Sequence, residues 1–145
     1  MAAVRRNRAT ELMWRAHARL FTLSRGRIGA KVLGMPTLQL TTVGRRSGEQ
    51  RQTMLMYLDD DGTPVVFASN AGEPKPPAWW LNLQASPAAT VMTRDGERAV
   101  RAREADGAER ERLWRAVLEL NRDYATYQER TGERRIPVVL LEPVT

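Results

Sequence analysis

Apolar residues in the first part of the chain recur with the spacing of a helix. Between residues 9 and 24 they come three and four positions apart, while Arg15 and Arg19 lie one turn apart on another side. The apolar positions are Leu12, Met13, Ala16, Leu20, Phe21 and Leu23. Glycines follow at positions 26, 29 and 34, and the helical period stops there. The pattern predicts an amphipathic helix and then a change of structure.

Alternating and unbroken apolar runs replace the helical period further along the chain. They predict strands at residues 37–43, 52–58, 63–69, 89–93, 97–104 and 136–141. Residues 59–62 (DDDG) and 94–96 (RDG) have the composition of hairpin turns, which join antiparallel neighbours. These six strands do not alternate regularly with helices, so we expect a mainly antiparallel sheet, and a small barrel is compatible with it.

Three further helices are expected among these strands. Pro77 suits the first turn of one of them, which ends before Pro87. Asp106 and Glu109 have the spacing of a capping box and begin a second helix. The apolar stripe of that helix consists of Leu113, Trp114, Val117 and Leu118. A third helical stretch carries two tyrosines, and the whole pattern predicts one α+β domain with helices flanking a sheet.

Composition excludes several classes of function. The chain has 145 residues, the usual size of one domain, and no cysteine, which excludes disulfides, thiolate zinc sites and cysteine nucleophiles. Its one histidine leaves too few ligands for a histidine-based metal site, so no metal is expected. No apolar stretch approaches the ~20 residues that span a bilayer, and the arginine-containing N-terminus is not typical of a secretory signal. The expected compartment is therefore the cytoplasm.

The charge favours a partner that carries phosphate. The net charge is +6, and all cations except Lys31 and Lys75 are arginines. Nucleic acid, an anionic membrane and a phosphorylated coenzyme would all suit it, although the arginine bias could also reflect a GC-rich genome. The chain lacks a helix-turn-helix, an RNA-binding aromatic pattern and a zinc finger, so no nucleic-acid partner is expected.

A candidate phosphate site lies in the turn at residues 44–51. Two glycines bracket this turn, so successive backbone N–H groups could converge on an anion. Arg45, Arg46 and, just beyond, Arg51 add permanently charged donors, and Ser47 adds a hydroxyl. An ordinary solvated hairpin turn would have the same composition, so this alternative stays open.

Two further features could line a ligand site. Small residues at 68–72 lead into the helix that carries Trp79 and Asn82 on one face, although tryptophans can equally anchor such a helix on the core. Tyr124 and Tyr127 share one helical face and could contact a substrate, or could pack with their hydroxyls in water. No catalytic triad or carboxylate pair accompanies them, which favours a cofactor that brings its own chemistry.

These stretches resemble the deazaflavin-dependent nitroreductase family. The resemblance rests on LTTVGRRSG at residues 40–48 with Arg51, on residues 68–87, and on IPVVLLEP at residues 136–143. The family consists of small split-β-barrel proteins of actinobacteria, so the resemblance implies this fold and the use of coenzyme F420 in preference to FMN. It divides the chain into an N-terminal helix and linker, 1–34, and a deazaflavin-binding barrel, 35–145.

The resemblance also implies a set of site residues. Phosphate and tail would be held by Arg45, Arg46, Ser47 and Arg51. The ring system would be lined by Gln52, Thr53, Met54, Leu55, Met56, Phe67, Ala68, Ser69 and Asn70, and closed by Ala78, Trp79, Trp80, Leu81, Asn82 and Tyr124. The candidate catalytic residues are Tyr124, Tyr127 and Ser69. Hydride would pass from the reduced deazaflavin to a quinone, a nitro compound or an activated alkene.

Several expectations complete this interpretation. A non-catalytic split barrel that binds a flavin, a deazaflavin or a tetrapyrrole is the main alternative. Met56 stands where some family members have a tyrosine, so nitroimidazole reduction is not carried over. The protein is expected to be a monomer or a weak dimer. Its N-terminal helix is expected to dock on the barrel, with contact to anionic lipid at the inner face of the membrane as the alternative.

Overall fold

The computed structural model describes residues 7–23, 31–32 and 35–144. Its helices are α1 (Arg8–Leu23), α2 (Ala78–Ala85), α3 (Gly107–Leu120) and α4 (Asp123–Arg130), with a short 3-10 helix η1 (Asn70–Gly72). Its strands are β1 (Lys31–Val32), β2 (Met35–Val43), β3 (Gln50–Met56), β4 (Leu58–Asp60), β5 (Thr63–Phe67), β6 (Ala88–Thr93), β7 (Gly96–Glu104) and β8 (Val138–Pro143). All six predicted strands and all four helices are present, and β1 and β4 are short strands that the sequence pattern did not resolve.

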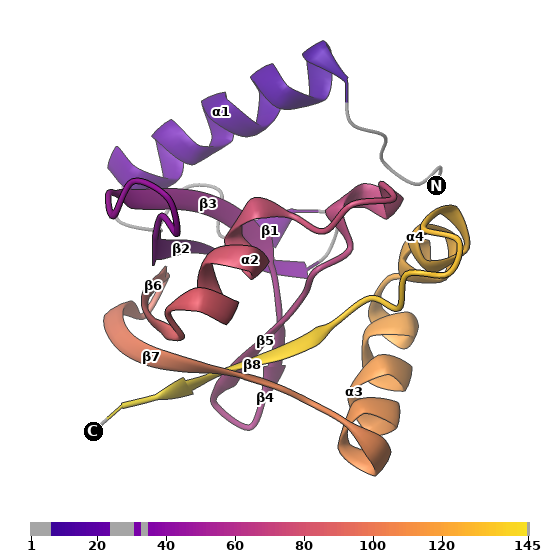
Figure 1. The fold of residues 1–145 in the computed structure, drawn as a ribbon. Helices are drawn as coiled ribbons and strands as arrows, with labels where there is room; N and C mark the ends of the chain where they lie inside the picture. Colours follow the sequence, from indigo (N-terminus) through magenta and orange to yellow (C-terminus); the bar gives the residue numbers. More distant parts are fainter. Residues whose placement is uncertain (1–6, 24–30, 33–34, 145) are drawn as a thin grey trace.

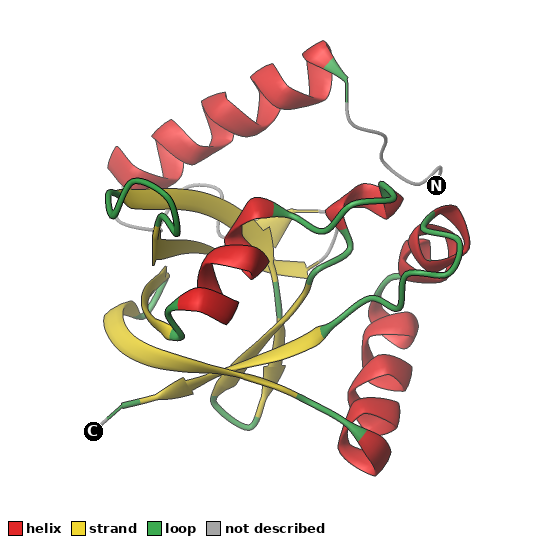
Figure 2. Ribbon diagram, viewed as in Figure 1, coloured by secondary structure: helices red, strands yellow, loops and turns green. Residues whose placement is uncertain are grey.

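The sheet curls because its two ends are consecutive in the chain. The strands follow the order β3, β2, β6, β7, β8, β5, β4, with β1 also paired to β2, and every pairing is antiparallel. Only Tyr57 separates β3 at one end of this path from β4 at the other, and its backbone N–H donates to the carbonyl of Pro36. The sheet must therefore bend round on itself, which gives the expected split barrel (Figure 2).

Two strands are buried on both faces and so divide the core into two parts. In β5, Val65 and Phe67 pack with α3 and α4, whereas Val66 faces the opposite cluster, which contains residues of α2. Strand β8 alternates in the same way, with Val138 on the first side and Val139 on the second. The residues on the two sides of these strands thus pack against α2, α3 and α4 and hold these helices around the barrel (Figure 1).

The predicted capping box of α3 does not form. Asp106 is the N-cap residue but makes no side-chain capping hydrogen bond. Glu109 instead accepts hydrogen bonds from Arg103 on β7, the shorter at 2.7 Å, and Glu142 on β8 accepts from the same guanidinium. Glu109 thus pairs with the charged Arg103 on the sheet instead of a backbone N–H of its own helix, and this pair fixes α3 against β7.

Helix α1 docks on the barrel through a face that the sequence analysis did not predict. It lies over β2 and β3 (Figure 1), with Phe21 fully buried and the rings of Trp14, His17 and Phe21 in succession along the docked side. Most of the predicted stripe is solvent-exposed: Leu12, Met13, Leu20 and Leu23 are between 51% and 80% exposed. The helix docks on the barrel as expected, but the face that it buries is the one with the large aromatic rings and not the one with most of the aliphatic stripe.

Candidate active site

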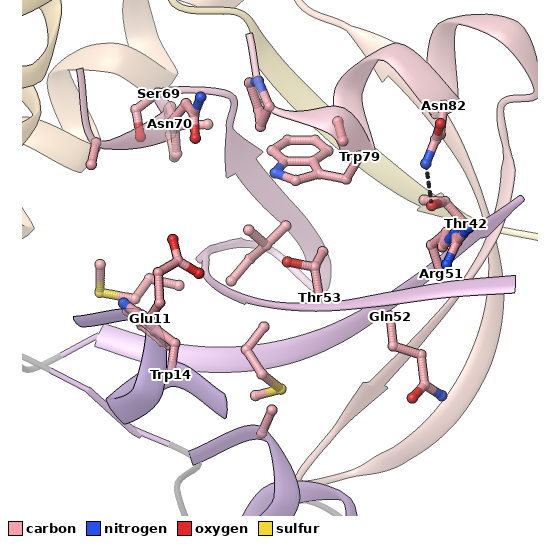
Figure 3. Close-up of a pocket in the computed structure, with 18 of the residues that line it drawn as sticks. Glu11, Trp14, Thr42, Arg51, Gln52, Thr53, Ser69, Asn70, Trp79 and Asn82 are labelled. Atoms are coloured by element: carbon pink, nitrogen blue, oxygen red, sulfur yellow. Dashed lines mark hydrogen bonds between the residues drawn. The ribbon is translucent and has the colours of Figure 1, made fainter. Parts of the chain in front are cut away.

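An elongated cavity of about 680 Å³ lies beside strand β3. One end is formed by the turn after β2, and the other by residues of β5, η1 and α4. Figure 3 shows Arg51, Thr42 and Asn82 at the first end, Ser69 and Asn70 at the second, and Trp79 between them. Five residue steps along β3 separate Arg51 from Met56, roughly 17 Å at the usual rise of a strand. The cavity therefore suits a long ligand with chemically different ends.

The turn at the first end is closed by its own hydrogen bonds. The N–H of Gly44 donates to the carbonyl of Glu49, that of Gly48 to the carbonyl of Gly44, and that of Glu49 to the Ser47 hydroxyl. The N–H of Arg45 donates to Asn82. Four of the six N–H groups of residues 44–49 are thus engaged within the protein, so the predicted concavity of backbone donors is reduced to the N–H groups of Arg46 and Ser47. An anion here would be bound mainly by side chains.

Asn82 ties the turn to both β2 and α2. Its Oδ1 accepts from the Arg45 backbone N–H at 3.1 Å and from Arg45 Nη1 at 3.0 Å, while its Nδ2 donates to Thr42 Oγ1 at 3.3 Å. Both Asn82 and Thr42 are buried, so these bonds are shielded from competing water. Asn82 therefore supports the arginine turn from below as well as lining the cavity.

The guanidinium groups at this end fit a polyanionic ligand. Arg45, Arg46 and Arg51 all line the cavity and are solvent-exposed, and the Ser47 hydroxyl lies among them. The described ion pair of this group joins Arg51 to Glu49 at 3.5 Å, with both side chains more than half exposed. Three cations facing one carboxylate leave an excess of positive charge, which matches a phosphate with further acidic groups.

Most of the predicted ring-lining residues reach the cavity. Every member of 52–56 lines it, as do Phe67, Ser69, Asn70, Ala78, Trp79, Asn82, Tyr124 and Tyr127. Because strand side chains alternate, Thr53 points towards Trp79, whereas Gln52 points to the other side of β3 (Figure 3). Residues 52–56 therefore do not face a single ring together.

Three predicted residues do not line the cavity. Ala68 is fully buried and Trp80 is 7% exposed, and both belong to the core cluster with α2. Leu81, on the same helix, is also absent from the lining. A helix turns about 100° per residue, so the five residues 78–82 cannot all face the cavity, and the three that line it are Ala78, Trp79 and Asn82.

The second end is a cluster of buried aromatic rings. Tyr124 lies 5.3 Å from Phe67 and 5.4 Å from Tyr127, measured between ring centroids. Both tyrosines are less than 5% exposed, so they do not pack with their hydroxyls in bulk water. Burial, with a smaller contribution from Tyr127, raises the pKa of Tyr124 well above its usual value. Its side chain is therefore a neutral hydrogen-bond donor.

Helix α1 contributes a wall that the sequence analysis missed. Its lining residues are Thr10, Glu11, Trp14, Arg15 and Ala18. Figure 3 shows Glu11 and Trp14 on the side of the cavity across from Ser69 and Asn70. The available signal was the spacing of Trp14, Ala18 and Phe21, which lie on one helical face, but of these three only Phe21 was part of the predicted apolar stripe.

A curled antiparallel barrel with a cationic, elongated cavity and a buried phenol at its far end is typical of a cofactor-binding oxidoreductase. The chain belongs to the F420H(2)-dependent quinone reductase family, whose model matches residues 12–143. An F420H(2)-dependent quinone reductase of Mycobacterium tuberculosis is 35% identical over 131 residues, which cover 88% of this chain and 87% of the relative.

Solved structures agree with this assignment. One described as an F420-H2 dependent reductase (FDR-A) has 37% identity and a TM-score of 0.67, and covers 74% of this chain and 94% of its own. Another, described as a domain-swapped dimer, has 34% identity and a TM-score of 0.70, and covers 92% of this chain and 99% of its own. The predicted split barrel, deazaflavin coenzyme and enzyme class are thereby confirmed. No helix in the described part of the chain is long and apolar enough to span a membrane.

Proposed function

We propose that this protein reduces a quinone with reduced coenzyme F420, and that the cavity beside β3 is where both bind. One observation carries the proposal: a single cavity joins an excess of guanidinium groups to a buried, neutral phenol. The family supports both the coenzyme and a quinone as the acceptor.

At the cationic end, Arg45, Arg46 and Arg51 would bind the phosphate and the acidic tail of the coenzyme. Ser47 would add a hydroxyl contact, and Asn82 would hold Arg45 in place through its two hydrogen bonds. Trp79 and Thr53 would then contact the ring system from opposite sides of the cavity. Such contacts fix where the ring lies, which is the main protein contribution to a hydride transfer.

At the aromatic end, Tyr124 would donate a hydrogen bond to an oxygen of the quinone. When bound, the reduced coenzyme supplies a hydride; with one proton the quinone becomes a hydroquinone, and solvent can deliver that proton. Negative charge develops on the quinone oxygen as the hydride arrives, so a neutral phenol donor stabilises the transition state there. Trp14 and Met56, which also line the cavity, would help to exclude water.

A paired titration tests this proposal. Oxidised F420 and FMN are titrated side by side, and oxidation of reduced F420 by a soluble quinone is then followed at steady state. We expect F420 to bind more tightly than FMN, with a preference that shrinks at high salt because the tail contacts are Coulombic. Equal or tighter binding of FMN at low salt, or no quinone-dependent turnover, would contradict the proposal.

We also propose that the outer face of α1 lies on anionic membrane, where a lipophilic quinone would be available. Leu12, Met13, Leu20 and Leu23 are exposed on this face, and arginines lie beside it. An apolar stripe flanked by arginines suits the interface of an anionic bilayer. The inner face of the same helix lines the cavity, so a quinone would have a short path from lipid to the site.

Vesicle flotation tests this second proposal, with Leu20→Ser/Leu23→Ser compared with Leu120→Ser, an exposed leucine on α3. We expect the parent and the α3 variant to float with phosphatidylglycerol vesicles and the α1 variant to remain in solution. Flotation that is equal for all three, or absent for the parent, would contradict it. Light scattering on the same samples shows whether the chain is instead a dimer that covers α1.

A further inference from the structure

The segment that carries Ser69 and Asn70 into the cavity has an unusual backbone. Three consecutive residues adopt positive φ: Asn70 at 49°, Ala71 at 53° and Gly72 at 81°. Glycine adopts this region freely, but Asn and Ala do so at a cost. A segment of this kind keeps its shape only where surrounding contacts impose it. Residues 68–73 must therefore be held by contacts with the rest of the protein.

Three of the hydrogen bonds that hold this segment come from Arg134. Its Nη1 donates to the carbonyl of Ala68 at 2.9 Å, and its Nη2 donates to the carbonyls of Ser69 at 2.8 Å and Glu73 at 2.9 Å. One planar guanidinium thus joins the start and the end of the segment. A lysine ammonium is a compact donor on an unforked stem and cannot reproduce this spacing.

Arg134 is itself attached to the helix that carries the tyrosines. Its carbonyl accepts from the Thr131 hydroxyl at 2.6 Å and from the Gln128 side-chain amide at 2.8 Å. The Oε1 of Gln128 also accepts from the N–H of Ile136 at 2.9 Å. Gln128 in α4 and Thr131 at its C-cap therefore hold the backbone at Arg134 and Ile136.

We propose that Arg134 is a positioning residue that holds residues 68–73 in the shape that presents Ser69 and Asn70 to the cavity, at a fixed distance from Tyr124 and Tyr127. The two sets of hydrogen bonds make the loop and α4 one mechanical unit. The structural part of this proposal rests on these hydrogen bonds alone, whereas the expected effect of Arg134 on turnover rests on the proposed function. Arg134 does not line the cavity, so it acts through the residues it holds.

The test compares Arg134→Lys with Arg135→Lys, a neighbouring exposed arginine. Amide hydrogen exchange is measured first, on the protein without coenzyme. In Arg134→Lys we expect exchange across residues 68–73 to accelerate by about tenfold or more, the effect of losing at least one charge-assisted hydrogen bond, with α2 unchanged. In Arg135→Lys all segments should match the parent. Unchanged exchange of residues 68–73 in Arg134→Lys would overturn the proposal.

Kinetics then separate positioning from simple stability. We expect Arg134→Lys to lower kcat for quinone reduction by roughly tenfold while the affinity for oxidised F420, held at the distant arginine turn, changes less than about threefold. Accelerated exchange with an unchanged kcat would overturn the role in the reaction. If Arg134→Lys does not fold, Thr131→Val, which removes one bond to the Arg134 carbonyl, must produce the same pattern in smaller measure. A parent without F420-dependent turnover would refute the proposed function, while hydrogen exchange would still test whether Arg134 holds residues 68–73.

Discussion

The two ends of the cavity are built in opposite ways. At the cationic end, the arginines are exposed on a turn that is closed by hydrogen bonds within residues 44–49 and supported by Asn82. At the aromatic end, Phe67, Tyr124 and Tyr127 are buried and come from β5 and α4, which are far apart in the chain. The first end is thus mostly local, and the second exists only when the whole barrel is folded.

This difference corresponds to what each end must do. Attraction between guanidinium groups and a polyanion acts over several ångströms and tolerates motion of exposed side chains. Hydride transfer requires the reacting atoms to be held within contact distance, where a displacement of about 1 Å costs much of the rate. The buried, closely packed rings of the aromatic end suit the hydride transfer that we propose there, and damage to one end should leave the function of the other end intact.

The largest expected effect comes from filling Gly72. A Cβ there would lie 2.6 Å from Arg130 Cβ and 3.0 Å from the carbonyl of Tyr127, and φ is +81°. We expect Gly72→Ala to lower the free energy of unfolding by roughly 3 kcal/mol, because backbone strain and steric overlap add. Chemical denaturation measures it.

Gly48 is the matched control, since it lies in the arginine turn at φ +73° and a Cβ added there would have no atom within 4 Å. Gly48→Ala should cost only about 1 kcal/mol, the strain alone. Equal costs at the two glycines would show that α4 does not pack against η1 as tightly as described.

The next effect should appear in binding rather than stability. Changing Arg45 and Arg46 together to Ala removes two charge-assisted contacts, and we expect affinity for F420 to fall by at least about tenfold. The thermal midpoint of the free protein should change little, because both side chains are exposed and the backbone N–H of residue 45 still donates to Asn82. Fluorescence titration and a thermal melt measure the two quantities. Unchanged affinity would mean that residues 44–51 form only a hairpin turn.

A smaller, opposite pattern is expected from Tyr124→Phe. The ring stays in the aromatic cluster and only the hydroxyl is lost, so affinity for oxidised F420 should change less than about threefold. Quinone reduction should fall by about tenfold, consistent with the loss of one hydrogen bond made mainly in the transition state. Steady-state kinetics beside the titration decide it. A variant that turns over like the parent would reduce Tyr124 to a wall of the pocket.

The same division explains how far the sequence could predict this site. The arginine turn was found because glycines and charges there are local signals, and the strands on either side have clear alternation. The wall from α1 was missed because the pattern shows an apolar stripe but not which face a partner covers; the structure buries Phe21 and exposes Leu12. The hydrogen bonds of Arg134 were also missed, because their acceptors are backbone carbonyls more than sixty residues away, which leave no trace in composition.

The smallest expected effect concerns pH: the contribution of the Tyr124 hydroxyl to the rate should not change between about pH 6 and about pH 10. Burial raises the pKa of Tyr124 above its usual value of about 10, so the phenol stays protonated in the folded protein where an exposed tyrosine would ionise. The ratio of the parent rate to the Tyr124→Phe rate, which cancels any titration of coenzyme or quinone, should therefore be constant from about pH 6 to about pH 10. Stability, in contrast, should depend on pH. Above about pH 10 the tyrosine of the unfolded chain releases its proton and that of the folded chain does not, so the free energy of unfolding should fall as the pH rises further. A rate ratio that declines with a midpoint below about pH 10 would show that the hydroxyl is exposed to water and that the aromatic end is as open as the cationic one.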